Sequence, residues 1–260
     1  MSATKSKTPT RFMPPGPFQS IRLLKFYGDE AKKLTAAQIT NAINGMAPFN
    51  PDVKPRAGFV EVSVSGKTIT ADMYVAYDVY ATRFDKKGEP EKNSFVTIER
   101  GSVIIRLDQK LVEIRGSSRL ASKFRSVLYE ITEVRAEPLI FEKETRREIY
   151  DMLIKPTQAP PKPLDISIDH IVYIDILKKD LKKAEFRGDK LQHKAEVGHY
   201  SRMYDGTISR FTGIFIYPSN TPYKTTINFD NSSVLIFKTS DGILEKDLRW
   251  IIKTLAESSE

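Results

Sequence analysis

The sequence predicts an α+β fold with two pseudo-repeated halves, each a mostly antiparallel sheet with helices on one face. Three observations lead to this class. The stretch Ser102–Ile131 reads as a strand, a tight turn, a second strand and an amphipathic helix. Residues 224–255 repeat that pattern near the other end of the sequence. Several further stretches alternate apolar and polar residues, which is typical of half-buried strands.

The two copies match position by position. Pairing Ile105 with Ile227 in the first strand also pairs Val112 with Val234 in the second. After a short insertion at the strand-to-helix corner the helices match too, in the pairs Leu120 and Leu244, Phe124 and Leu248, Val127 and Ile251, Leu128 and Ile252, and Ile131 and Leu255. Matching apolar faces on both elements predict a duplicated unit.

Residues 1–18 are basic and end in Pro14-Pro15-Gly16-Pro17, which predicts a flexible, Pro-rich arm. A first half follows over 19–134. Thr35 is a suitable N-cap for a helix over 34–46, and Gly101 inside a strand indicates a bulge or bend. The other expected elements are strands at 19–27, 59–65, 68–84, 94–107 and 111–115, turns at 65–67 and 85–90, and a helix at 119–131 capped by Ser117 or Ser118.

The second half covers 135–260. It begins with a charged helix at 142–154 and continues through PTQAPPKP, residues 156–163, which reads as a linker. Strands are expected at 164–177, 207–217, 222–229 and 233–237, and a closing helix at 244–256. Residues 178–203 are so highly charged that no element is assigned, and we expect a poorly ordered charged insertion there.

The order of elements resembles a repeat of the TATA-box-binding-protein (TBP) fold. The resemblance rests on two sequence segments: MAPFNPDVKPRAGFVEVSV, in which Asn50-Pro51 follow a helix, and IIRLDQKLVEIRGSSRLASKFRSVL. The resemblance implies two TBP-like halves that form a curved sheet with helices on the convex face. It also implies DNA binding, although TATA-box binders wedge phenylalanines between base steps and the turns at 65–67 and 107–110 contain none. Glu61 and Glu113 on the expected outer face also fit a phosphate backbone poorly.

The composition of the chain limits the classes of function that it can have. The net charge of +8 over 260 residues and a pI near 9.4 favour a nucleic acid or an acidic protein surface as partner. The chain has 0 Cys, which excludes disulfides and thiolate sites and fits an intracellular protein. No apolar run approaches the roughly 20 residues that span a bilayer, and no signal-peptide core is present, so neither a membrane nor secretion is expected.

The candidate nucleic-acid-binding residues form two basic clusters. One surrounds the start of the helix at 119–131 and comprises Arg115, Arg119, Lys123 and Arg125. The other comprises Lys178, Lys179, Lys182, Lys183, Arg187 and Lys190. Because acidic residues are interleaved with the second cluster, a solvated charged face is an equally good interpretation of it.

No catalytic signature is found: the chain has no P-loop, no Rossmann glycine pattern and no nucleophile elbow. The 3 His lack metal-ligand spacing, so no catalytic residue, metal or cofactor is expected. A metal-dependent nuclease built on Asp165, Asp169 and His170 is a minor alternative, since alternating aspartates also mark the wet side of a strand.

The sequence therefore predicts a non-enzymatic nucleic-acid-binding protein, for DNA or RNA, that belongs to a larger complex. The alternative is a structural subunit that holds a protein partner without touching nucleic acid. The exposed hairpin around Gly88 favours this alternative. No small-molecule substrate is evident.

Overall fold

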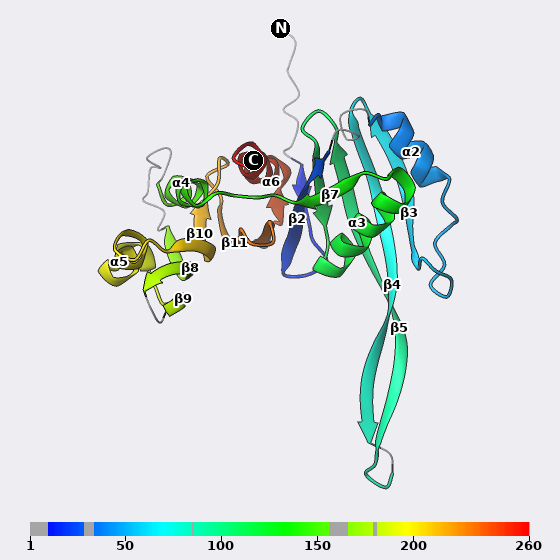
Figure 1. Ribbon diagram of the computed structural model, residues 1–260, viewed down its shortest axis with the longest axis horizontal. Helices are drawn as coiled ribbons and strands as arrows, with labels where there is room; N and C mark the ends of the chain where they lie inside the picture. Colours follow the sequence, from blue (N-terminus) through cyan, green and yellow to red (C-terminus); the bar gives the residue numbers. More distant parts are fainter. Residues whose placement is uncertain (1–9, 29–33, 85, 156–165, 179–180, 260) are drawn as a thin grey trace. The chain divides into compact units, whose positions relative to one another are not determined.

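A computed structural model describes residues 10–28, 34–84, 86–155, 166–178 and 181–259 (Figure 1). The chain divides into two compact units. Unit 2 is the continuous segment Ile21–Pro138, and unit 1 combines Met1–Ser20 with Leu139–Glu260. Each unit has antiparallel strands and a few helices, so the predicted α+β class is confirmed. The predicted linker at 156–163 lies outside the described residues.

Unit 2 has a sheet with the strand order β3-β4-β5-β6-β2, and β7 pairs with β2. The strands are β2 (Phe18–Tyr27, whose first residues belong to unit 1), β3 (Ala57–Ser65), β4 (Thr68–Phe84), β5 (Pro90–Arg106), β6 (Leu111–Arg115) and β7 (Arg135–Pro138). The helices are α2 (Ala36–Asn44) and α3 (Ser118–Thr132), and both cover the same face of the sheet (Figure 1).

Local chemistry explains both helices. The Thr35 hydroxyl accepts the Gln38 N–H while the Gln38 side chain accepts the Thr35 N–H, which is the reciprocal capping box expected at a helix start. Ser117 caps α3 in a similar way by accepting the N–H groups of Arg119 and Leu120. The apolar faces of the two helices then pack with the sheet in one core around Ile39, Phe124 and Met73, among others.

Gly101 does not mark a bulge, which was one of the two predicted alternatives. The pairing of β4 with β5 is unbroken where Met73 lies opposite Gly101. A Cβ atom at Gly101 would stand 2.7 Å from the Arg115 carbonyl oxygen and 2.8 Å from a Leu120 methyl carbon. The glycine is therefore needed for the close approach of α3 and β6 to β5.

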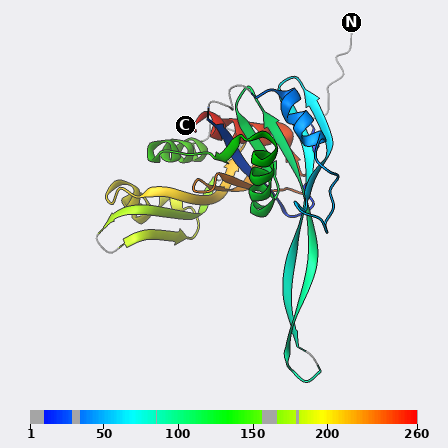
Figure 2. The same ribbon diagram turned by 45° about the vertical axis from the view of Figure 1, so that its right-hand side comes forward.

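The β4–β5 hairpin is much longer than the other strands of unit 2. Its register runs without a break from Thr68 opposite Arg106 to Phe84 opposite Pro90. The half near the sheet packs under the helices, and the other half projects from unit 2 as a twisted two-stranded ribbon (Figures 1 and 2).

Unit 1 has a sheet with the strand order β12-β11-β10-β8-β9. Its strands are β1 (Arg11–Phe12), β8 (Ser167–Lys178), β9 (Leu181–Arg187), β10 (Thr207–Ile216), β11 (Pro222–Asn228), β12 (Ser233–Phe237) and β13 (Ile243–Leu244). Its helices are α4 (Lys143–Ile154), the 3-10 turn η1 (Leu191–His193), α5 (Ala195–Arg202) and α6 (Glu245–Glu257). Tyr150 of α4 contacts Phe211 of β10 edge to face, with ring centroids 5.2 Å apart.

Residues 181–203 are ordered, contrary to the expectation of a poorly ordered insertion. They form β9, η1 and α5, and β9 adds an edge strand beside β8. Phe186 anchors the segment, because its ring contacts Tyr173 of β8 and Tyr200 of α5. Charged residues alternate with Phe186 along β9, so the sequence of this segment reads as polar although one side of the strand is apolar.

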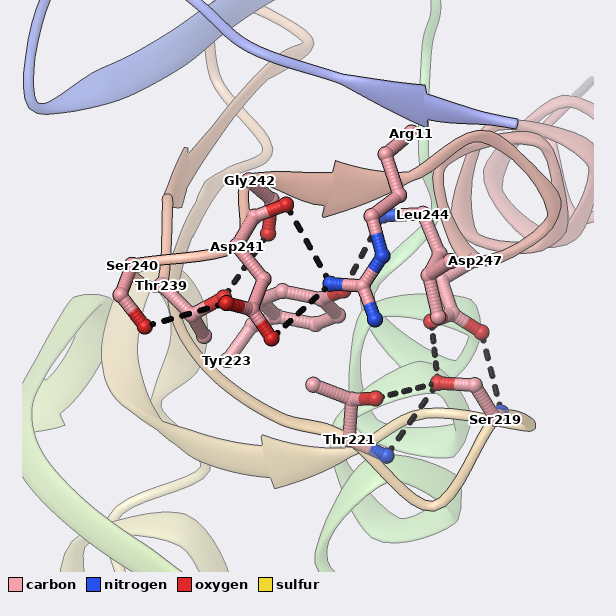
Figure 3. Close-up of polar contacts among 10 residues, drawn as sticks. All are labelled: Arg11, Ser219, Thr221, Tyr223, Thr239, Ser240, Asp241, Gly242, Leu244 and Asp247. Atoms are coloured by element: carbon pink, nitrogen blue, oxygen red, sulfur yellow. Dashed lines mark hydrogen bonds and ion pairs between the residues drawn. The ribbon is translucent and has the colours of Figure 1, made fainter. Parts of the chain in front are cut away.

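Residues 10–18 of the predicted arm contact the end of unit 1. Strand β1 pairs with β13, and Arg11 donates to the Asp241 carbonyl oxygen at 3.2 Å and pairs with its carboxylate at 3.3 Å (Figure 3). The backbone N–H of Lys238 donates to the Pro17 carbonyl at 3.1 Å. These bonds join segments more than two hundred residues apart, so no local sequence pattern reveals them.

The predicted duplication is matched at the level of one hairpin and its helix. In β5–β6, Ile105 lies opposite Val112, and in β11–β12, Ile227 lies opposite Val234, in the same register. Each hairpin is followed by a helix, α3 or α6, and the matched residues Phe124, Val127 and Leu128 of α3 and Leu248, Ile251 and Ile252 of α6 are buried.

Candidate nucleic-acid interface

Two of the predicted phosphate-binding arginines are held inside unit 2. Arg115 lies 2.6 Å from the carboxylate of Glu113, which is fully buried and also lies 2.8 Å from Arg106. Arg125 donates to the Ala136 carbonyl oxygen at 2.9 Å and pairs with Glu137. Both guanidinium groups therefore fix the packing of β6 and α3.

The N-terminus of α3 already holds an internal carboxylate. Glu99 of β5 accepts the Ser117 N–H at 2.9 Å and the Ser117 hydroxyl at 2.7 Å. It also accepts the Tyr77 hydroxyl at 3.4 Å. The expected contribution of the helix terminus to an anion site is thus met by Glu99 within the fold.

Arg119 and Lys123 line a groove beside α3 that we call the basic groove. It has a volume of about 780 Å³ and lies between α3, strand β4 and the segment before β3. Its lining residues are Lys54, Pro55, Arg56, Val75, Ala76, Tyr77, Arg119, Ser122, Lys123, Ser126 and Glu130. The α3 side thus presents cations and hydroxyls, whereas Val75 and Ala76 supply an apolar floor.

The cations of the groove are positioned by the fold. The Arg119 guanidinium lies over the Tyr77 ring, 4.9 Å from its centroid, which is within the range of a cation–π contact. Arg56 has a left-handed backbone (φ 53°), and its carbonyl accepts the Ala76 N–H at 2.8 Å. Its side chain pairs with Asp78 at 2.8 Å.

The basic groove keeps a positive charge. Arg56 is neutralised by Asp78, but Lys54, Arg119 and Lys123 have no carboxylate within ion-pair distance among the described residues. Glu130 at one end is the single acidic lining residue. Three cations around a hollow surface are a physical match for several phosphates.

Lys54 and Arg56 were not predicted, because nothing in the sequence brings their proline-rich loop to a helix some sixty residues away. Lys123 and Arg119 were predicted from their cluster. A spacing of four residues places these two side chains on one face of the helix, and this spacing is the feature of the sequence that predicts their proximity.

Two residues of the second predicted cluster share one carboxylate. On β9, Lys183 and Arg187 flank Glu185, and Arg187 lies 2.8 Å from the Glu185 carboxylate and Lys183 lies 3.3 Å from it. Hydrogen bonds from Arg187, Lys183 and His170 lower the pKa of Glu185 to about 2. Lys182 is exposed, Lys190 precedes η1, the Lys178 side chain is not described, and Lys179 lies outside the described residues.

Within the described residues of unit 1, no helix covers the sheet face opposite α4 and α5. Because α5 packs beside α4 on the helix side, residues 181–203 leave that face free, and a hollow of about 510 Å³ crosses five strands. It is lined by Asp169, His170, Arg187, Arg210, Thr212, Lys224, Thr226 and Leu235. Burial lowers the pKa of His170, and a hydrogen bond with Glu185 opposes this shift.

The nuclease alternative gains no support from this face. Asp169 pairs with Lys224 at 2.5 Å, and His170 lies 3.0 Å from Glu185. Asp165 lies outside the described residues. Within the described ranges, no group of three or more histidine or acidic side chains is placed to hold a metal ion.

Comparison with known proteins adds no assignment: no protein-family model matches the chain, and no curated protein matches its sequence. In the described part of the chain, every helix is too short or too polar to cross a membrane.

Proposed function

We propose that the protein binds nucleic acid without catalysing a reaction, and that the basic groove contacts the phosphate backbone. The observation that carries the proposal is the convergence of Lys54, Arg119 and Lys123 on one hollow surface without neutralising carboxylates. Phosphate contacts of this kind supply affinity without reading sequence. Ser122 adds a hydroxyl along the same helix face, whereas the Ser126 hydroxyl donates to the Ser122 carbonyl oxygen at 3.3 Å.

A TBP-like scaffold for both units is part of this proposal. The matched register of β5–β6 and β11–β12, each followed by a helix, supports it. The proposal does not include DNA bending, because Gly66 and Asp108 lie at turns without a phenylalanine wedge. The outer face of unit 2 also carries Asp72 and Glu61 near Arg100, which makes it a poor phosphate surface.

The test is a salt titration of binding to labelled duplex DNA, single-stranded DNA and single-stranded RNA. Three phosphate contacts predict a slope of log K against log salt of about −2.7 for duplex and about −2.1 for single strands. The duplex and single-stranded arms distinguish the ligand classes. Binding without a salt slope, or no binding at about 50 mM salt, would end the proposal.

Single substitutions make the test specific to the groove. Lys123→Gln and Arg119→Gln should each weaken binding and reduce the slope by about 1. Arg249→Gln is the matched control, because Arg249 is an exposed arginine on α6 that pairs with Glu245. Equal losses from Arg249→Gln and Lys123→Gln would show that total charge, rather than the groove, governs binding.

A second candidate function is that of a subunit in a protein assembly. One observation favours it: the projecting half of the β4–β5 hairpin exposes large apolar side chains, including Tyr80 and Phe84. The two functions use different surfaces of unit 2, so both can hold in one complex.

A further inference from the structure

The projecting half of the β4–β5 hairpin, which we call the distal ribbon, comprises residues 78–84 and 90–98. Residues 78–84 pair with 90–96 without a break, and Thr97 and Ile98 pair with Tyr77 and Ala76 at its base. Two isolated strands are marginally stable in water at best, and stable hairpins rest on a third strand or a helix. Within the described residues, large apolar side chains of the ribbon stay exposed on both faces, whereas α2 and α3 cover one face of the near half of the same hairpin.

One face of the distal ribbon is apolar. Side chains alternate between the two faces of a ribbon, and directly paired residues share a face. Tyr80, Phe84, Val96 and Ile98 therefore share one face. Tyr80 and Phe84 are each 72% exposed, and Val96 and Ile98 are about half exposed.

The area of this face is large enough for a specific contact. Because a whole aromatic side chain offers roughly 200 Å², Tyr80 and Phe84 together expose about 300 Å². Adding Val96, Ile98 and Pro90 brings the face to roughly 500 Å² per chain. Two such faces in contact would bury up to about 1,000 Å², which reaches the lower limit for a specific interface.

The same face is complementary to itself. From its base to its tip the paired rows are Ala76 with Ile98, Asp78 with Val96, Tyr80 with Ser94, Thr82 with Lys92, and Phe84 with Pro90. A two-fold axis through the Tyr80 row would place the Asp78 row against the Lys92 row of a second copy. Because this axis runs across the strands, each strand faces its own copy, so Phe84 would meet Ala76 and Pro90 would meet Ile98. The apolar ends of the face thus meet twice, as an isologous contact requires. Lys92 would lie one strand across from Asp78 of the other copy, and that carboxylate also pairs with Arg56 of its own chain at 2.8 Å.

We propose that the distal ribbon is a self-association surface, on which two copies of this chain pack their ribbons face to face and antiparallel about the Tyr80 row. The inference is independent of the proposed nucleic-acid binding, since none of the three unpaired cations of the basic groove lies on the ribbon. It assigns the apolar face a single occupant, a second copy of the chain.

Cysteine cross-linking tests the geometry directly. The chain has 0 Cys, so one introduced thiol reports alone. Ser94→Cys lies on the axis and should give a disulfide-linked dimer under mild oxidation. Asn93→Cys, its neighbour on the opposite face, should remain monomeric at the same concentration. Equal cross-linking of the two variants would overturn the face-to-face arrangement.

Mass measurement by light scattering or sedimentation tests the energetics. The unmodified chain should form a species of twice its 29.6 kDa mass, and Tyr80→Ser with Phe84→Ser should weaken the dimer at least tenfold. Phe95→Ser is the control, because Phe95 is 53% exposed on the other face of the ribbon. Lys92→Glu should also weaken the dimer, because it places a carboxylate against Val96 and one strand across from Asp78 of the other copy, whereas Arg83→Glu, beside Glu91 on the other face, should not.

A chain that stays monomeric at about 100 µM, where weak specific contacts already populate dimers, would overturn the proposal. The outcome is separable from that of the nucleic-acid test. Mass measurements need no nucleic acid, and the groove variants leave the ribbon unchanged.

Discussion

Replacing Glu113 by glutamine is expected to destabilise unit 2 strongly. The Glu113 carboxylate is fully buried and lies between Arg106 at 2.8 Å and Arg115 at 2.6 Å. The side chains of these two arginines are only 18% and 10% exposed. Glu113→Gln keeps the size of the side chain but removes the negative charge that both guanidinium groups face.

The magnitude follows from the burial of the three groups. Breaking a buried ion pair by removing one partner costs about 3 to 5 kcal/mol, because a charge remains where water cannot solvate it. Arg106 and Arg115 keep some access to water, so we expect a cost near the lower limit, about 3 kcal/mol. Because proteins unfold with a total free energy of about 5 to 15 kcal/mol, this loss is a large fraction of the stability.

Urea unfolding followed by circular dichroism measures the effect. With an m-value of about 2 kcal/mol per molar, the midpoint should fall by about 1.5 M. Glu61→Gln is the matched control: its carboxylate is 74% exposed and 3.8 Å from Arg100, so its loss should cost less than about 0.5 kcal/mol. A Glu113→Gln midpoint as close to the unmodified protein as that of Glu61→Gln would refute the reasoning.

Two further predictions concern unit 1. Burial raises the pKa of Tyr150 from 10 to about 12, so the unfolded chain loses this proton at a lower pH than the folded chain. The free energy of unfolding should therefore fall as pH rises from about 10 to 12. Tyr150→Phe keeps the ring contact with Phe211 and should reduce that fall, measured by urea unfolding at alkaline pH. The Asp247 carboxylate is fully buried and accepts hydrogen bonds from the N–H of Ser219, at 3.0 Å, and from the Ser219 hydroxyl (Figure 3). Asp247→Ala should therefore lower the free energy of unfolding in urea by about 1 to 3 kcal/mol. A change below about 0.5 kcal/mol would contradict this.

Much of the fold is predictable from local patterns. The helix at Ala36–Asn44 has its cap at Thr35, and the long strand Thr68–Phe84 has the predicted bounds. Both rest on interactions between residues a few positions apart. Strands β1 and β13 are two residues long and exist only because distant segments meet, so no periodicity identifies them. Phe186 could have identified β9, because it stands out as the large apolar residue of a charged segment.

The candidate site was predictable only in part. Arg119 and Lys123 share a helix face, and their spacing reveals it. The role of Arg115 could also have been recognised, since Glu113 stands two residues away on the same strand and therefore on the same face. The loop that supplies Lys54 and Arg56 reaches the groove through tertiary packing, which local spacing does not encode.

The division of the chain has a consequence for the order of folding. Unit 2 is one uninterrupted segment, so all of its contacts can form while later residues are still being synthesised. Unit 1 needs both ends: the Lys238 ammonium donates to the Pro14 carbonyl at 3.0 Å across a separation of 224 residues. Closing so long a loop is slow relative to local contacts. During translation residues 10–18 can therefore make these contacts only after β12, β13 and α6 have been synthesised.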